Sequence, residues 1–255
     1  MRNWSRKFIK ESETMNAFAS TFGDHGTKYL FMDFDDTVRH SIGLPDGDRK
    51  PPTTPEEVSV FPGVGQAIKE WQDAGWQVCG MTNQAGPLRK RSYVPDFMRS
   101  QATLEDAAFG AGKVMQQTLV QLGVTFPIFF CSDATVFVLE GGNVHVAQSG
   151  FGQENKKDGK ASKPNSSMGD CAVAKFGSPD LHNSYMIGDS YQGADEGLAK
   201  AMEFEWIHPG RLGKDFIRFT ESFFREDGEK PAKVADEAPV LQKSYSSSLG
   251  YHNFG

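Results

Sequence analysis

The sequence has only three cysteines, and they lie far apart: Cys79, Cys131 and Cys171. They form no CxxC pair, which excludes a disulfide framework and the usual zinc spacings. Cys79 and Cys131 lie in apolar stretches, so we expect them to be buried, reduced thiols. This use of cysteine indicates a reducing, cytoplasmic setting.

Long apolar runs and an excess of positive charge are also missing. No stretch of 18 apolar residues exists, so we expect no membrane span. Residues 1–10 are basic and polar without an apolar centre, so we expect no signal peptide. The formal net charge of −6 does not favour a broad nucleic-acid or membrane surface, but it is compatible with a local basic groove.

The composition is that of a globular protein. The chain has 255 residues, of which 38% are hydrophobic and 24% are charged, so it can bury one full core. We expect an N-terminal extension at 1–27, one domain at 28–225 and a loosely held, Ser-rich tail at 226–255.

Short apolar runs alternate with amphipathic stretches along the central domain. The apolar runs predict strands, and the 3.6-residue periodicity predicts helices. The alternation predicts a mostly parallel sheet with helices on both faces, and Glu140–Asn143 predicts the turn of a β-hairpin. The expected strands are 28–32, 76–81, 126–131, 185–187 and 204–207, and the expected helices are 63–74, 104–122 and 166–176.

Three polar clusters fall where predicted strands end. They are Asp33 with Asp35, Thr82 with Asn83, and Asp189. Ligands gather at the carboxyl ends of parallel strands, so these clusters predict one shared site. Taken alone, each has a plain structural alternative as an N-cap or a polar turn.

The two aspartates suit different chemical roles. The carboxylate of Asp33, the first residue past its strand, can act as a nucleophile and form an acyl-phosphate. Asp35 projects to the same side if the backbone is extended, where it can protonate a leaving oxygen and then deprotonate water. Strand-end acids repel one another unless a cation lies among them, which points to Mg²⁺.

The remaining candidates would bind phosphate or metal. The hydroxyl of Thr82 and the backbone N–H groups beyond it can hold phosphate oxygens, and Lys163 precedes a predicted helix start, where it would stabilise a transferring phosphoryl group. Asp189 can complete a hard oxygen site for Mg²⁺. Asp195 and Glu196 either support that site or are first-turn acids favoured by the helix dipole.

These motifs resemble the four motifs of the haloacid dehalogenase (HAD) superfamily, in the same order and over about residues 28–210. The resemblance implies Asp33 as nucleophile, Asp35 as acid/base, Thr82 and Lys163 on phosphate, and Asp189 as metal ligand. It also implies that Asp33, the backbone carbonyl of Asp35 and Asp189 hold the metal. The motifs that carry the resemblance are Asp33-Phe34-Asp35-Asp36-Thr37, Thr82-Asn83-Gln84, Lys163-Pro164 and Gly188-Asp189.

The sequence looks closest to the branch of histidinol phosphatases, heptose-bisphosphate phosphatases and polynucleotide 3′-phosphatases. The stretches 54–58, 61–64 and 78–86 carry this similarity. The zinc loop typical of heptose-bisphosphate phosphatases is incomplete here, so we expect no zinc. The gap between Asp189 and Asp195 is longer than usual, which makes Asp195 a weak ligand candidate.

The resemblance implies a Rossmann-like three-layer α/β/α sandwich with one small β-hairpin insertion. Neither insertion point holds a full cap domain, so we expect an open site. Arg89, Lys90 and Arg91 either contact a second phosphate or form an exposed basic turn.

We therefore expect an Mg²⁺-dependent phosphomonoester hydrolase that acts through an aspartyl-phosphate. The expected substrate is a small phosphorylated metabolite of the histidinol phosphate or sugar phosphate type. The alternatives are a 3′-phosphatase acting on DNA or RNA ends and a non-catalytic phosphate-binding domain. We expect Asp36 to face the loop and to have no catalytic role.

Overall fold

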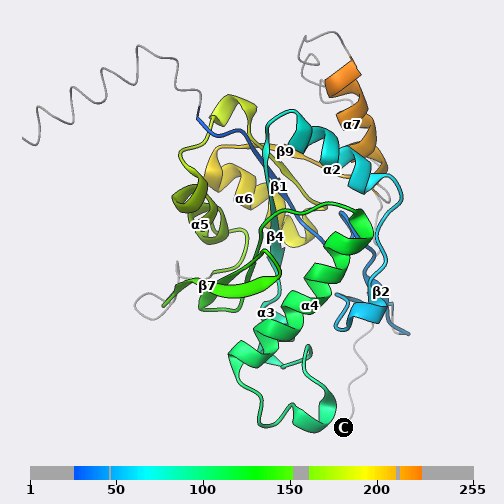
Figure 1. The fold of residues 1–255 in the computed structure, drawn as a ribbon, viewed down its shortest axis with the longest axis vertical. Coiled ribbons are helices and arrows are strands. Elements are labelled where there is room, and N and C mark those ends of the chain that lie inside the picture. Colours follow the sequence, from blue (N-terminus) through cyan, green and yellow to red (C-terminus); the bar gives the residue numbers. More distant parts are fainter. Residues whose placement is uncertain (1–25, 46, 152–160, 211–212, 226–255) are drawn as a thin grey trace, which may run out of the picture.

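The computed structural model of the chain describes residues 26–45, 47–151, 161–210 and 213–225 (Figure 1). Almost all of the predicted extension at 1–27, and the whole predicted tail at 226–255, lie outside the described residues. Within the described residues, no helix is both long enough and apolar enough to span a bilayer.

Five parallel strands and one antiparallel hairpin form the main sheet, in the order β7-β6-β5-β4-β1-β8-β9. The strands are β1 Tyr29–Met32, β2 Ile42–Gly43, β3 Arg49–Lys50, β4 Gln77–Asn83, β5 Ile128–Cys131, β6 Thr135–Glu140, β7 Asn143–Ser149, β8 Tyr185–Ile187 and β9 Glu205–Ile207. The helices are α2 Val64–Asp73, α3 Ala85–Arg89, α4 Leu104–Leu122, α5 Ser167–Phe176, α6 Ala194–Met202 and α7 Lys214–Arg225. Short 3₁₀ turns lie at η1 Pro55–Glu57, η2 Asp96–Met98, η3 Leu181–Asn183 and η4 Tyr191–Gly193.

Helices cover both faces of the sheet, as predicted (Figure 1). Alternate residues of β1 point to opposite faces of the sheet. Leu30 and Met32 pack into the core under α2, α4 and α7. Tyr29 and Phe31 pack into the core under α5 and α6. A strand buried on both sides must be apolar throughout, which explains the unbroken run at 29–32. The three-layer α/β/α fold is confirmed.

Helix boundaries follow local chemistry. Thr103 caps α4 in a capping box with Asp106, and Gly123 ends this helix in the left-handed conformation at φ 71°. Trp71 of α2 is fully buried, and its Nε1 donates to Thr220 Oγ1 of α7 at 2.9 Å. This contact fastens α7, which the sequence reading did not predict, onto the first core.

Two hairpins accompany the parallel strands. The predicted hairpin around Glu140–Asn143 is confirmed, and its strand β6 pairs with β5, so the hairpin extends the main sheet. A second hairpin, β2–β3, lies between β1 and α2, and in it Ile42 pairs with Lys50. Strands of two residues leave too short a pattern to detect in a sequence.

The cysteine prediction is confirmed for the two apolar positions. Cys79 and Cys131 are buried free thiols, and Cys171 is free and half-buried. Burial raises the pKa of Cys131 to about 12, so this side chain behaves as a small apolar group.

Candidate active site

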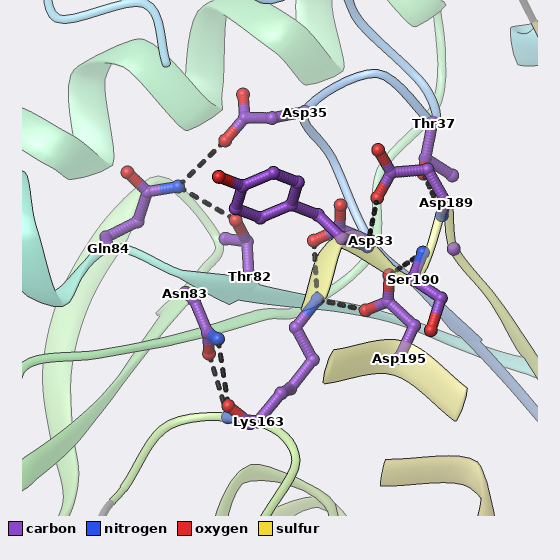
Figure 2. Close-up of polar contacts among 12 residues, drawn as sticks. Asp33, Asp35, Thr37, Thr82, Asn83, Gln84, Lys163, Asp189, Ser190 and Asp195 are labelled. Atoms are coloured by element: carbon purple, nitrogen blue, oxygen red, sulfur yellow. Dashed lines mark hydrogen bonds and ion pairs between the residues drawn. The ribbon is translucent and has the colours of Figure 1, made fainter. Parts of the chain in front are cut away.

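Neighbouring strands bring the predicted motifs to one edge of the sheet. In the parallel register Met32 of β1 lies opposite Gly80 of β4 and opposite Ile187 of β8. The residues that follow these positions therefore meet, as Figure 2 shows. They line a cavity of about 730 Å³, whose walls include Asp33, Asp35, Thr82, Asn83, Lys163, Asp189 and Asp195.

Lys163 lies at the centre of this site. Its Nζ lies 2.5 Å from Asp33 Oδ1 and 2.5 Å from Asp195 Oδ1, and all three side chains are buried. One ammonium thus bridges two carboxylates that come from distant parts of the chain (Figure 2). The sequence reading placed Lys163 near phosphate and did not foresee its pairing with Asp195.

Asn83 fixes the backbone of Lys163. Its Nδ2 donates to the Lys163 carbonyl at 3.1 Å, and its Oδ1 accepts from the Lys163 N–H at 2.8 Å. Both ends of the amide are therefore in use, so in this structure Asn83 positions the lysine. The neighbouring Thr82 is buried, and its hydroxyl accepts from Gln84 Nε2 at 2.8 Å.

A separate set of donors holds Asp35. Its Oδ1 accepts from Arg39 Nε at 2.8 Å, and its Oδ2 accepts from Gln84 Nε2 at 3.1 Å. Arg39 is fully buried and also donates to Thr118 Oγ1 of α4 at 3.0 Å. The hydroxyl of Tyr93 in turn contacts Gln84 Oε1. These donors fix the orientation of the Asp35 carboxylate.

Asp33 and Lys163 shift each other's pKa in opposite directions. Burial raises the pKa of Asp33, the Lys163 charge lowers it, and Asp195 and Asp35 raise it further, so the pKa lies above its usual range. Burial alone would lower the pKa of Lys163, but Asp195 and Asp33 outweigh it and raise the pKa. Lys163 therefore stays charged. Asp33 lies near two further carboxylates, those of Asp195 and Asp35, and the single charge of Lys163 does not balance them.

Asp33, Asp189 and Asp195 form a cluster in which one carboxylate oxygen of each lies within 4.8 Å of the others. Burial raises the pKa of Asp189, the Tyr191 N–H lowers it, and Asp195 and Asp36 raise it. Three hard oxygen donors with surplus negative charge suit a hard divalent cation such as Mg²⁺. Asp35 contributes no carboxylate to this cluster, because Arg39 and Gln84 bind it.

Asp195 is the residue whose importance the sequence reading underrated. It lies in the first turn of α6, as one alternative held, but it is buried and its Oδ2 accepts from the Ser190 N–H at 2.9 Å. A Cβ on Gly188 would approach the Asp195 carboxyl carbon to 2.2 Å. Gly188, which precedes Asp189, was therefore the feature of the sequence that indicated a side chain packed closely against the backbone here.

The basic turn lies elsewhere. Arg89 pairs with Asp133 at 3.0 Å, and Arg91 donates to the carbonyls of Leu88 and Ala102. Residues 89–91 are not among the described residues that line the cavity around Asp33. Asp36 faces the β2–β3 hairpin, as expected, and pairs with Arg49 at 2.7 Å.

No protein-family model matches the chain. A D-glycero-D-manno-heptose-1,7-bisphosphate 7-phosphatase of Thermosynechococcus vestitus is 29% identical over 135 residues, which span 52% of this chain and 58% of that relative. A Mesorhizobium loti protein described as a HAD-like phosphatase is 22% identical with a TM-score of 0.50, covering 79% of this chain and 89% of its own.

A D,D-heptose 1,7-bisphosphate phosphatase of B. bronchiseptica, solved with magnesium and phosphate, is 18% identical. The match covers 75% of this chain and 99% of that one. Its TM-score is 0.37.

The fold of the chain is similar to that of the Mesorhizobium loti protein. Over 135 residues its sequence is similar to that of the Thermosynechococcus vestitus phosphatase, of which the chain spans less than two thirds.

We predict that Lys163→Met lowers the free energy of unfolding by about 3 kcal/mol, because it leaves two buried carboxylates without their cation. Urea denaturation at pH 7 measures this loss. Lys175→Met is the matched control, since Lys175 is half-exposed and pairs with Glu140 on the surface, where we expect a loss below about 1 kcal/mol. Equal losses in the two variants would contradict a buried structural ion pair.

Proposed function

We propose that the protein is a phosphomonoester hydrolase that uses Asp33 as a nucleophile and Mg²⁺ as cofactor, and acts on a small phosphorylated metabolite. The observation that carries this proposal is the buried Asp33–Lys163–Asp195 triad beside Asp189, at the carboxyl ends of β1 and β8. The curated relative acts on a sugar bisphosphate, which supports a phosphorylated substrate.

The first step transfers the phosphoryl group to Asp33. Lys163 binds Oδ1, so Oδ2 is the oxygen that attacks phosphorus while the bond from phosphorus to the leaving oxygen breaks. Lys163 also lies where a phosphoryl oxygen would come to rest beside Asp33, and its positive charge stabilises the charge that develops there. Thr82 also lines the cavity, and its hydroxyl accepts from Gln84 Nε2 and can donate its own proton to a second phosphoryl oxygen.

Asp35 moves the proton. As an acid it carries the proton on Oδ2, gives up its contact with Gln84 Nε2 and protonates the leaving oxygen. In the second step the Asp35 carboxylate takes a proton from water, which attacks phosphorus and breaks the bond to Asp33. Arg39 stays bound to Oδ1 throughout, so Oδ2 keeps its direction.

The metal would be held by carboxylates of Asp33, Asp189 and Asp195 and by the Asp35 carbonyl. When bound, Mg²⁺ supplies positive charge that keeps Asp33 ionised and neutralises phosphoryl oxygens. Among the described residues, Lys163 is the one cation that pairs with any of the three clustered acids. A divalent ion removes the remaining excess of negative charge.

Asp33→Asn should reduce turnover of 4-nitrophenyl phosphate at least about thousandfold, because an amide cannot form an acyl-phosphate. Release of nitrophenolate with added Mg²⁺ measures the rate. The control is Asp73→Asn, an exposed carboxylate on α2 that should leave the rate unchanged. Retention of the wild-type rate by Asp33→Asn would exclude Asp33 as nucleophile.

Asp35→Asn should separate substrates by leaving group. Loss of a general acid costs roughly 10²- to 10⁴-fold for an alkyl phosphate, but much less for 4-nitrophenyl phosphate, whose leaving group departs as a stable anion. Rapid-quench measurement of the first turnover isolates this step from hydrolysis of the intermediate. An equal loss for both substrates would show that Asp35 does not protonate the leaving group.

Mg²⁺ should raise the melting temperature of the wild-type protein by about 5–10 °C at a hundred times its Kd. Asp189→Asn should abolish this shift and should be no less stable than the wild type without metal, because it removes a carboxylate repelled by Asp195 and Asp36. Differential scanning fluorimetry with and without Mg²⁺ tests both statements. An unchanged Mg²⁺ shift in Asp189→Asn would remove this residue from the metal site.

A further inference from the structure

An aromatic ring lies at the mouth of the catalytic cavity. Tyr191 of η4 lines this cavity, and 73% of its surface is exposed. Its ring is therefore available to a molecule whose phosphate lies at Asp33. None of the roles assigned to the catalytic motifs uses this side chain.

The turn that carries Tyr191 is fastened to the acid cluster. The Tyr191 N–H donates to Asp189 Oδ1 at 3.1 Å, and the Ser190 N–H donates to Asp195 Oδ2 at 2.9 Å. Ser190 and Gln192, on either side of the tyrosine, both have φ of 55°, which is uncommon for residues other than glycine. The backbone under the ring is thus held at a fixed place relative to Asp189 and Asp195.

Two cations from the β2–β3 hairpin line the same cavity: Arg49 and Lys50. Arg49 Nη1 pairs with Asp36 Oδ2 at 2.7 Å, and 67% of the Arg49 side chain is exposed. A guanidinium has five N–H donors, so this single pairing leaves donors for an anion. Asp36 raises the pKa of Arg49, and the charge of Asp189 raises it further. The Arg49 guanidinium therefore interacts electrostatically with Asp189, a member of the acid cluster.

The charge distribution determines where an anionic leaving group can bind. Among the described residues, six acids line the cavity, and Lys163 pairs with two of them. Among the described lining residues, Arg49 and Lys50 are the cations outside the central cluster. Arg49 pairs with Asp36, and Lys50 pairs with Glu57 at 3.1 Å. An anion on the leaving group is therefore repelled over most of the described wall and attracted near these two cations. The six acids are Asp33, Asp35, Asp36, Asp48, Asp189 and Asp195.

We propose that Tyr191 and Arg49 form a leaving-group subsite for a phosphomonoester that carries a flat heteroaromatic ring and a second phosphate, as a nucleoside bisphosphate does. The ring stacks on Tyr191, and the second phosphate binds Arg49 with help from Lys50. The subsite rests on the proposed function only in placing the first phosphate at Asp33. A cavity of about 730 Å³ lies within the usual range for ligands of this size.

Calorimetric binding to the inactive Asp33→Asn variant in Mg²⁺ tests this subsite without turnover. The probes are adenosine 3′,5′-bisphosphate, adenosine 3′-monophosphate and fructose 1,6-bisphosphate, which lacks an aromatic ring. We expect the nucleoside bisphosphate to bind most tightly. Adding Tyr191→Ala should weaken both adenosine ligands at least about fivefold and leave the sugar unchanged.

Three further variants make the result specific. Tyr191→Phe keeps the ring and should retain the wild-type affinities, and Phe109→Ala, which removes an exposed ring on α4, should change none of them. Arg49→Gln should weaken the bisphosphate more than the monophosphate. A trinucleotide with a 3′-phosphate is compared with adenosine 3′-monophosphate. Tighter binding of the trinucleotide identifies the ligand as the end of a strand. Binding of the mononucleotide at least as tight as that of the trinucleotide identifies it as a free nucleotide.

The subsite is overturned if Tyr191→Ala changes the ring-bearing and ringless ligands alike, or if the sugar bisphosphate binds as tightly as the nucleoside bisphosphate. Turnover of 4-nitrophenyl phosphate by the wild-type protein is measured in parallel. Absence of that turnover contradicts the proposed function, whereas the binding results decide the subsite by themselves.

Discussion

The buried contact of Lys163 with Asp33 and Asp195 is the constraint on which the site depends. Parallel strands bring acidic side chains together at one edge, and a buried cluster of carboxylates is unfavourable without a counter-charge. Lys163 supplies part of that charge, and Asn83 holds its backbone in place. The chain thus orders the site itself while leaving excess negative charge for a divalent cation.

Two carboxylates only two residues apart have different surroundings. Asp33 is buried against Lys163, whereas Asp35 lies between Arg39 and Gln84, with Thr118 of α4 behind the arginine. Under the proposed function, Asp33 attacks phosphorus and Asp35 exchanges a proton. Different environments for paired acids are the usual physical basis for dividing such roles.

Most of the fold could be predicted from the sequence, because buried parallel strands such as β1 and amphipathic helices such as α4 carry strong local patterns. The site was predictable where a motif residue ends a strand, as with Asp33, Thr82 and Asp189. Asp195 was considered only a weak ligand candidate and Arg39 was not considered, because the contacts of Asp195 with Lys163 and of Arg39 with Thr118 join distant parts of the chain. Strands of two residues, such as β2 and β3, have no detectable pattern, so the cations of that hairpin could not be placed at the cavity.

The central claim is that phosphoryl transfer passes through an acyl-phosphate on Asp33, and trapping that intermediate tests it most directly. The protein is mixed with substrate and Mg²⁺, quenched and reduced with borohydride, which converts an acyl-phosphate into an alcohol. Peptide mass spectrometry then locates the modified residue. The account predicts substrate-dependent conversion of residue 33 to homoserine. Efficient turnover with an unmodified Asp33, or with the modification on another carboxylate, would contradict it.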